Sequence, residues 1–172
     1  MGGARSPRFA LPFQVAAICY RRCGGSVEFL LVNTNGGGKW TFPKGAPATS
    51  LSHSQAAERE AWEEAGARGT IEARHFHLYI HSKGVFWKPP GVQEFAVKAF
   101  LMEIDQMSQP LEDMRNPTWF NPEEARKILA KGREVKYARE IQAVIDRALE
   151  HIGPERSLSA RVVPVSRRPT LP

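Results

Sequence analysis

The sequence predicts an α/β domain in which a mixed β-sheet lies between helices. Short apolar segments at 13–20 and 27–32, and longer ones at 70–81 and 92–103, have the length and pattern of strands. Helical segments are interspersed among them. Because strands and helices do not alternate strictly, a mixed sheet fits better than a doubly wound parallel one.

The N-terminal segments begin the predicted sheet. Residues 13–20 and 27–32 are compact apolar runs that suit buried strands, and 21–25 form the turn between them. A flexible glycine-rich loop at 35–38 follows. The segment 39–45 is then expected to be short and extended, ending at Gly45.

The segment 52–65 carries the start and stop signals of a helix. Ser52 and Gln55 form a capping box, in which each side chain can bond to the backbone N–H of the other residue. Gly66 is the residue type that commonly ends a helix in the left-handed conformation. Small side chains spaced four residues apart suit close contact with a sheet. They are Ala57, Ala61 and Ala65.

The C-terminal half completes the prediction. Strands are expected at 70–81 and 92–103, around a loop at 83–91, with a short strand at 117–120. Helices are expected at 123–129 and 134–151. The second of these helices has one broad apolar face, made by Val135, Ile141, Val144, Ile145 and Leu149.

Composition and charge indicate one folded domain at 11–152 between flexible tails at 1–10 and 153–172. The hydrophobic content of 42% permits a core. Of the net charge of +6, residues 1–10 contribute +2 and residues 153–172 contribute +3, which leaves +1 for the body. The basic balance therefore does not favour nucleic acid as the partner of the folded domain.

The two cysteines, Cys19 and Cys23, are expected to be free thiols. They lie four positions apart, so a bridge would brace almost nothing, and no Cys/His pair with zinc-site spacing accompanies them. No apolar run approaches the ~20 residues of a membrane span, and no signal peptide is recognisable. A cytoplasmic location is the expectation.

Three carboxylates share one face of the predicted helix at 52–65. Glu60 is three residues from Glu63 and four from Glu64, so their like charges repel and something must offset the repulsion. One interpretation is a solvated acidic face balanced by Arg59. The other is a site for a hard cation, Mg²⁺ or Mn²⁺, because every donor is an oxygen.

The surrounding residues favour the cation site. Residues 45–67 read Gly-x5-Leu-x7-Arg-Glu-Ala-Trp-Glu-Glu-Ala-Gly-Ala. This pattern resembles the Nudix box, Gly-x5-Glu-x7-Arg-Glu-U-x-Glu-Glu-x-Gly-U, in which U is a bulky apolar residue. Six of the seven fixed positions match in register. They are Gly45, Arg59, Glu60, Glu63, Glu64 and Gly66.

The resemblance implies the Nudix-type α/β/α sandwich and a metal-dependent hydrolase of a phosphoanhydride (pyrophosphate) bond. It implies Glu60, Glu63 and Glu64 as metal ligands, with the main-chain carbonyl region at Lys44–Gly45 as an additional one. Arg59 is expected to pair with a neighbouring carboxylate and orient the cluster. The general base stays open between Glu63, inside the box, and Glu94 or Glu112, outside it.

The sequence departs from the box at three positions. Leu51 replaces the first glutamate, and Ala61 and Ala67 are small for the U positions. The lost glutamate usually braces the metal site, so Leu51 bears on rate and metal affinity more than on reaction type. It also keeps open an alternative, a Nudix-fold module with weakened catalysis that binds a phosphorylated ligand or RNA.

The resemblance extends beyond the box. Residues 40–45, Trp-Thr-Phe-Pro-Lys-Gly, are similar to the entry to the Nudix box, and 115–120 with the helix at 123–129 are similar to the closing strand and helix. Together they most resemble the diphosphoinositol polyphosphate and diadenosine polyphosphate phosphohydrolase branch. The implied substrates are nucleoside-diphosphate-linked compounds, dinucleoside polyphosphates or inositol pyrophosphates.

Substrate phosphates need cations in addition to the metal. Candidates on segments that the Nudix fold places near the cleft are Arg21, Arg22, Lys39, Lys44, Lys83 and Lys88, with Lys44 foremost because it lies inside the motif. For each of them a solvated surface position is the alternative. Trp40, Phe86 and Trp87 are candidates for stacking on a base, with a packing role as the alternative.

Overall fold

The computed structural model describes residues 11–36, 38–84 and 91–154. The predicted tail at 1–10 and residues 155–172 of the predicted tail at 153–172 lie outside the described residues, as do Phe86, Trp87 and Lys88.

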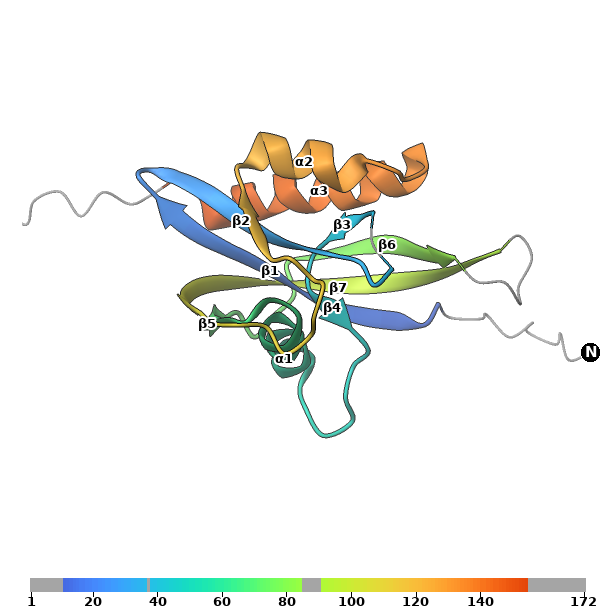
Figure 1. Ribbon diagram of the computed structural model, residues 1–172, viewed down its shortest axis with the longest axis horizontal. Coiled ribbons are helices and arrows are strands. Elements are labelled where there is room, and N and C mark those ends of the chain that lie inside the picture. The colour runs from blue at the N-terminus through green and yellow to red at the C-terminus, as the bar shows by residue number, and fades with distance from the viewer. Residues whose placement is uncertain (1–10, 37, 85–90, 155–172) are drawn as a thin grey trace, which may run out of the picture.

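A mixed sheet forms the centre of the domain (Figure 1). The strand β1 (Phe13–Cys23) pairs in parallel with β7 (Val92–Met107) and antiparallel with β2 (Ser26–Asn33). The short strands β3 (Trp40–Thr41) and β8 (Thr118–Phe120) pair with β2, and β4 (Lys44–Gly45) pairs with β1. The prediction of a mixed sheet is confirmed.

The single strand expected at 70–81 is wrong, because two strands occupy this region. They are β5 (Ala67–Ile71) and β6 (His77–Gly84), and both pair antiparallel with β7. Ile71 faces Met102 and His77 faces Ala99, so six steps along one chain face only three along the other. The extra residues leave the ladder between the two strands. The break between β5 and β6 is set by how each pairs with β7, which is distant in sequence. The local sequence pattern therefore does not predict it.

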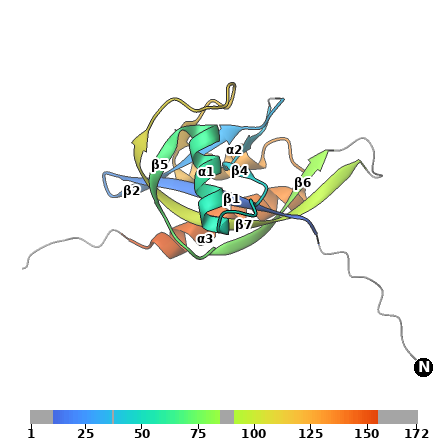
Figure 2. The same ribbon diagram turned by 90° about the horizontal axis from the view of Figure 1, so that it is seen from below.

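Helices cover both faces of the sheet (Figure 1). The helix α1 (His53–Ala65) lies on one face, and Figure 2 shows it from that side. The helices α2 (Pro122–Ala130) and α3 (Val135–Ile152) lie on the other. All three helices agree with their predicted positions to within one or two residues.

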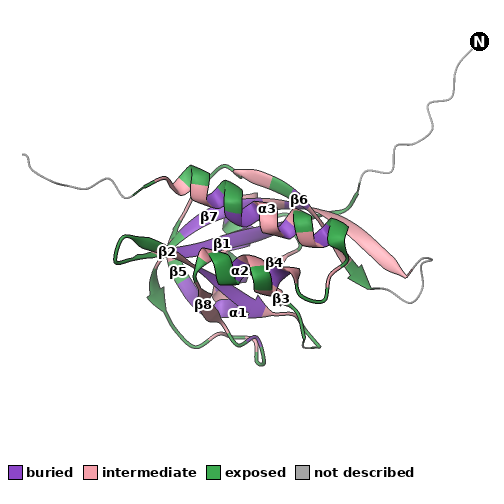
Figure 3. Cartoon of the chain, turned by 90° about the horizontal axis from the view of Figure 1, so that it is seen from above, coloured by how far each residue is buried: buried purple, intermediate pink, exposed green. Residues whose placement is uncertain are grey.

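Two hydrophobic clusters fill the two interfaces between sheet and helices. Alternate residues of β1 serve different faces: Val15 and Ala17 belong to the cluster under α1, and Ala16 and Ile18 to the cluster under α2 and α3. Figure 3 shows buried residues concentrated on the strands and on the inward faces of the helices. A central strand that is covered on both faces reads as a continuous apolar run, as 13–20 does.

The ends of two elements differ from the sequence prediction. β1 continues through residues 21–23, and the turn is confined to Gly24 and Gly25, which have φ angles of 57° and 81°. On α3, Val135 is 66% exposed and lies outside the buried face. Both Cys19, which is buried, and Cys23, which is exposed, are free thiols, as expected.

Candidate active site

The capping of α1 fixes the helix that carries the three carboxylates. Ser52 Oγ accepts from the Gln55 N–H at 3.2 Å, and the Ser52 N–H donates to Gln55 Oε1 at 2.9 Å. Gly66 ends the helix with a φ of 64°. The predicted capping box and stop signal are confirmed, and the small residues Ala57, Ala61 and Ala65 are fully buried against the sheet.

The backbone of β4 lies directly against two of these carboxylates. A Cβ atom at Gly45 would overlap the carboxyl group of Glu60, so only glycine permits this approach. The Lys44 N–H donates to Glu64 Oε2 at 3.3 Å. Glu60 and Glu64 are 9% and 4% exposed, although both belong to a residue type that is seldom buried.

Arg115, from the loop before β8, supplies the charge that offsets the carboxylates. Its side chain is buried, and it bridges Glu64 Oε1 at 2.8 Å and Glu112 Oε2 at 2.6 Å. It also donates to the main-chain oxygen of Asn33 at 3.1 Å. Sequence reasoning did not assign Arg115 to the site. The available signal was the unbalanced charge of the three glutamates, which required a cation from elsewhere in the chain.

Glu63 and Arg59 lie at the solvent-facing edge of the cluster. Arg59 Nε is 3.7 Å from Glu63 Oε1, and Arg59 Nη2 is 4.0 Å from Glu60 Oε1. The side chains of Arg59 and Glu63 are 44% and 36% exposed. Arg59 therefore touches two carboxylates loosely, whereas Arg115 holds Glu64 tightly.

Leu51 occupies the position of the missing box glutamate. It is partly buried and packs against the hydrophobic cluster under α1. An apolar residue thus stands where the box has a carboxylate. The negative charges that act on Glu60 and Glu64 come from α1 itself and from Glu112 in the loop before β8.

Burial shifts the protonation of the central groups. It raises the pKa of Glu64 to about 7, although the neighbouring Arg115 and Lys44 cations favour the charged carboxylate. Burial, and then the nearby Glu63 charge, also raises the pKa of Glu60. Burial lowers the pKa of the neighbouring Lys44 to about 8, although the nearby Glu64 carboxylate acts to raise it. These ionisable groups are held where water solvates them poorly.

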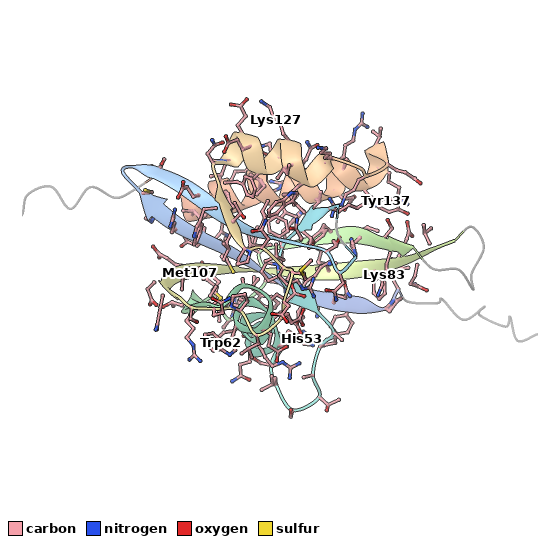
Figure 4. All side chains as sticks on the ribbon, in the orientation of Figure 1. His53, Trp62, Lys83, Met107, Lys127 and Tyr137 are labelled. Atoms are coloured by element: carbon pink, nitrogen blue, oxygen red, sulfur yellow. The ribbon has the colours of Figure 1, made fainter. Side chains whose placement is uncertain are left out.

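A cavity of about 630 Å³ opens beside this cluster, with Glu64 in its wall. Five cationic residues from separate parts of the chain line it: Lys39, Lys44, Lys83, Arg115 and Arg133. Lys83 and Tyr137, which also line the cavity, lie toward the same end of the molecule in Figure 4. The sequence analysis did not predict Arg133 as a site residue. The loop between α2 and α3 folds back so that the Arg133 side chain lines the cavity and donates to the Trp40 carbonyl oxygen at 2.8 Å.

The pKa of His81 reflects the positive charge of this wall. Burial, and then the charges of Lys44, Arg133, Lys39 and Lys83, lower its pKa to about 3. A neutral imidazole therefore lines the cavity at physiological pH. Since the surrounding cations disfavour a further positive charge, the same field attracts an anionic ligand.

Comparison with known proteins identifies the family. A family model described as the NUDIX domain matches residues 12–141. The chain belongs to the NUDIX family. The prediction drawn from residues 45–67 is thereby confirmed.

Two curated Nudix relatives come from Arabidopsis thaliana. Nudix hydrolase 16, mitochondrial, is 28% identical over 104 residues, which cover 59% of this chain and 58% of that protein. Nudix hydrolase 4 is 30% identical over 102 residues, which cover 59% of this chain and 47% of that protein. The match spans about half the length of these relatives.

Solved structures share the Nudix fold. The crystal structure of the C. elegans Ap4A hydrolase superposes with a TM-score of 0.57 at 25% identity, covering 84% of this chain and 100% of that one. The NUDIX domain of Shewanella oneidensis NrtR, complexed with ADP ribose, has a TM-score of 0.59 at 16% identity and covers 87% and 95% of the two chains. The predicted α/β/α architecture is confirmed.

Nudix hydrolases generally use divalent metal ions, and the donors at this site suit one. Glu60 and Glu64 offer only oxygen, and Gly45 leaves room for a carboxyl group where a Cβ atom would fill it. Within residues 11–36, 38–84 and 91–154, no three His, Cys, Asp or Glu side chains lie close enough together to hold an ion. Glu64 is instead engaged by Arg115, so the carboxylates would have to rearrange around a cation.

Two of the predicted substrate-binding residues lie away from the cavity. Arg21 pairs with Glu28 at 2.6 Å and lies over the ring of Trp119, and Arg22 donates to the Ile152 carbonyl oxygen. The cavity is instead at the opposite end of β1, where Val15 faces Gly45. Six residues of strand span about 20 Å, which is too far for Arg21 to contact a ligand held there.

Two further candidates, Trp40 and Glu94, are engaged in packing and in ion pairs. Trp40 packs edge-to-face on Phe120 with ring centroids 5.0 Å apart, which is a core contact. Glu94 accepts from Lys136 and from Tyr137, both at 2.7 Å.

Among the described residues, no helix is long and apolar enough to span a membrane.

Proposed function

We propose that the chain is a hydrolase that cleaves a phosphoanhydride bond in a small phosphorylated molecule. The observation that carries this proposal is the position of Glu64, a buried carboxylate on α1 that also lines a cavity with five cationic residues. Carboxylates suit a divalent cation, and the surrounding cations suit phosphate oxygens. The juxtaposition of the two is what hydrolysis of an anhydride requires.

Glu60 and Glu64, with the main chain at Gly45, would hold Mg²⁺ or Mn²⁺, and Glu63 would hold or orient its water. A divalent ion bound there supplies charge neutralisation and lowers the pKa of the attacking water. Arg115 keeps Glu64 oriented and balances its charge, while Arg59 balances the charge of Glu63 at the exposed edge without holding it closely.

We assign the general base to Glu63. A base needs an oxygen free to accept a proton, and the nearest cation contact of Glu63, with Arg59, is long at 3.7 Å. Glu112 is instead held by two N–H groups of Arg115, at 2.6 and 2.7 Å. Glu94 is engaged by Lys136 and Tyr137. These contacts leave Glu63 the freest of the three candidates.

The cationic wall supports a substrate with several phosphates. Lys39, Lys44 and Lys83 line the wall together and Arg133 adds a further positive charge, so the wall offers donors to several phosphate oxygens. Similarity to an Ap4A hydrolase and to a domain complexed with ADP ribose supports nucleotide-linked pyrophosphates among the candidate substrates. Dinucleoside polyphosphates, nucleoside-diphosphate-linked compounds and inositol pyrophosphates remain the substrate set.

The test is a substrate panel. Purified protein is incubated with diadenosine tetraphosphate, ADP-ribose and a diphosphoinositol polyphosphate, each with Mg²⁺, with Mn²⁺ and with EDTA. We expect metal-dependent release of phosphorylated products from at least one substrate, and none in EDTA. Hydrolysis that persists in EDTA contradicts the metal mechanism. Tight binding without turnover of any substrate supports the alternative of a binding module weakened by Leu51.

A further inference from the structure

Two cationic residues of the cavity wall come from segments that are far apart in the sequence and meet in the fold. Lys39 directly precedes β3, and Arg133 lies in the loop between α2 and α3. Both line the cavity. Their local contacts differ, and the difference indicates that the two residues have different roles.

The guanidinium group of Arg133 is bound to main-chain oxygens. One Nη atom donates to the Leu129 carbonyl oxygen near the end of α2, and the other donates to the Trp40 carbonyl oxygen of β3 at 2.8 Å. The last carbonyl groups of a helix have no partner within the helix, and an arginine side chain can satisfy one of them. Arg133 therefore ties the end of α2 to β3.

Lys39 is the chain neighbour of the strand residue that this bridge holds. Its own carbonyl oxygen accepts from the Thr34 N–H at 2.9 Å, so its backbone is fixed. Its side chain runs along the loop that Arg133 anchors, because a Cβ atom at Gly132 would lie 3.7 Å from Lys39 Cε and 3.9 Å from Lys39 Cγ. The loop thus forms a surface on which the stem of Lys39 lies.

The ammonium group of Lys39 is available to a ligand. Lys39 is exposed, and among the described residues its side chain makes no ion pair or hydrogen bond. A lysine side chain loses rotamer freedom when it binds a phosphate, and that loss opposes binding. A surface that already orders the stem reduces the loss.

We propose that Arg133 is a positioning residue that holds Lys39 at the cavity, where the Lys39 ammonium group contacts the phosphates of the ligand. Arg133 acts through its bridge from α2 to β3, and its own charge adds only to the positive field. The inference rests on the proposed function for its ligand. It separates two cations of the wall, one that contacts the ligand and one that acts through the other.

A double-mutant cycle tests this role. Dissociation constants are measured by calorimetry in Mg²⁺ for wild type, Arg133→Lys, Lys39→Met and the double variant. The probes are a methylene-bridged diadenosine tetraphosphate and inositol hexakisphosphate. Arg133→Lys keeps the positive charge, but a single ammonium group does not reproduce the planar fork that reaches both carbonyl oxygens. Lys39→Met keeps an unbranched stem and removes the phosphate contact.

For a probe that wild type binds, Lys39→Met should weaken binding by about tenfold or more, as for the loss of a hydrogen bond to a charged group. Arg133→Lys should weaken it by about fivefold when Lys39 is present and by less than about twofold in the Lys39→Met protein, because residues that act through one another are not additive. Arg126→Lys is the matched control. Arg126 donates to Asp146 at 2.6 Å outside the cavity, so this change should leave both affinities unaltered.

Three outcomes overturn the role of Arg133. No loss in Arg133→Lys means that Arg133 supplies charge alone. Equal losses with and without Lys39 mean that Arg133 contacts the ligand itself or that the whole domain is loosened. A wild-type protein that binds neither probe removes the phosphate contact of Lys39.

A second variant covers the case in which Arg133→Lys does not fold, as judged by circular dichroism. Arg133→Gln is also too short to span the two carbonyl oxygens, and its loss should again be larger when Lys39 is present. Failure of the proposed function looks different: the cycle shows the expected coupling between Arg133 and Lys39, while no phosphoanhydride is hydrolysed.

Discussion

The helices α1 and α3 cover opposite faces of one sheet, and they bury different kinds of side chain. The buried face of α3 is almost entirely apolar, with Ile141, Val144 and Ile145 against the strands. The buried face of α1 combines alanines with the carboxylates of Glu60 and Glu64. Apolar burial stabilises the fold, whereas burial of a carboxylate opposes it unless a partner compensates.

The difference assigns separate roles to the two faces. Close packing of alanines brings α1 near the sheet, and the backbone of β4 then lies against Glu60. Arg115 compensates Glu64, yet burial still raises the pKa of that carboxyl group. We infer that the α3 face chiefly supports stability and that the α1 face gives up stability to hold charged groups at the cavity.

The largest effect on stability should come from the α3 face. Ile145→Ala removes a fully buried side chain and should lower the free energy of unfolding by about 2–5 kcal/mol. Activity per folded molecule should stay within about twofold, because Ile145 does not line the cavity. Urea denaturation and turnover are measured on the same preparation. Val135→Ala, at a position that is 66% exposed, is the control from the same helix.

The largest effect on activity should come from the α1 face. Glu64→Gln keeps the shape of the side chain and removes a proposed metal ligand, so turnover should fall by at least ~100-fold. Metal-free stability should hold or rise at pH 8, because burial of the charged carboxylate is relieved. Glu58→Gln, on the same helix, is the control. A Glu64→Gln protein with normal turnover would remove Glu64 from the active site.

Local signals predicted α1 well. The capping box, the glycine stop at Gly66 and the spacing of alanines and glutamates all depend on neighbours within a few residues, and the helix in the structure begins and ends accordingly. The buried runs at 13–20 and 27–32, which lie within β1 and β2, were predicted for the same reason. The family was predictable because its pattern lies within the single segment 45–67.

Features set by distant parts of the chain were missed. The break between β5 and β6 depends on which residues of β7 they pair with. Arg115 and Arg133 join the site only after loops fold against α1 and β3. Arg21 was placed near the cleft, but its distance from the cavity depends on the direction and length of β1. Sequence spacing alone carries none of this information.

A smaller effect should appear in the pH dependence of metal-free stability. The pKa of Glu64 is raised from 4.5 to about 7, so the folded state favours the protonated carboxyl group. Its stabilising contribution is full below about pH 4.5 and is lost as pH rises to about 7. His81 acts oppositely, since its lowered pKa makes stability rise with pH between about 3 and 6.5.

The difference between two proteins isolates the Glu64 contribution. Wild type and Glu64→Gln share His81, so subtracting their unfolding free energies at each pH cancels its effect. The wild type should lose stability relative to Glu64→Gln as pH rises from about 4.5 to 7. A flat difference across this range would mean that Arg115 fully compensates the buried charge, and the contrast between the two helix faces would then disappear.

The smallest effect should come from the outer face of α3, where Glu150 pairs with Arg147 at 3.0 Å. These side chains are 66% and 59% exposed, so water and salt screen the pair and little is lost when it is broken. Glu150→Gln should change the free energy of unfolding by about 0.5 kcal/mol or less and leave turnover unchanged. The change in stability is measured by thermal unfolding at low and at high salt, with Glu64→Gln measured in parallel for comparison. If the exposed substitution altered turnover or stability as strongly as the buried one, burial would not be what distinguishes the carboxylates of α1.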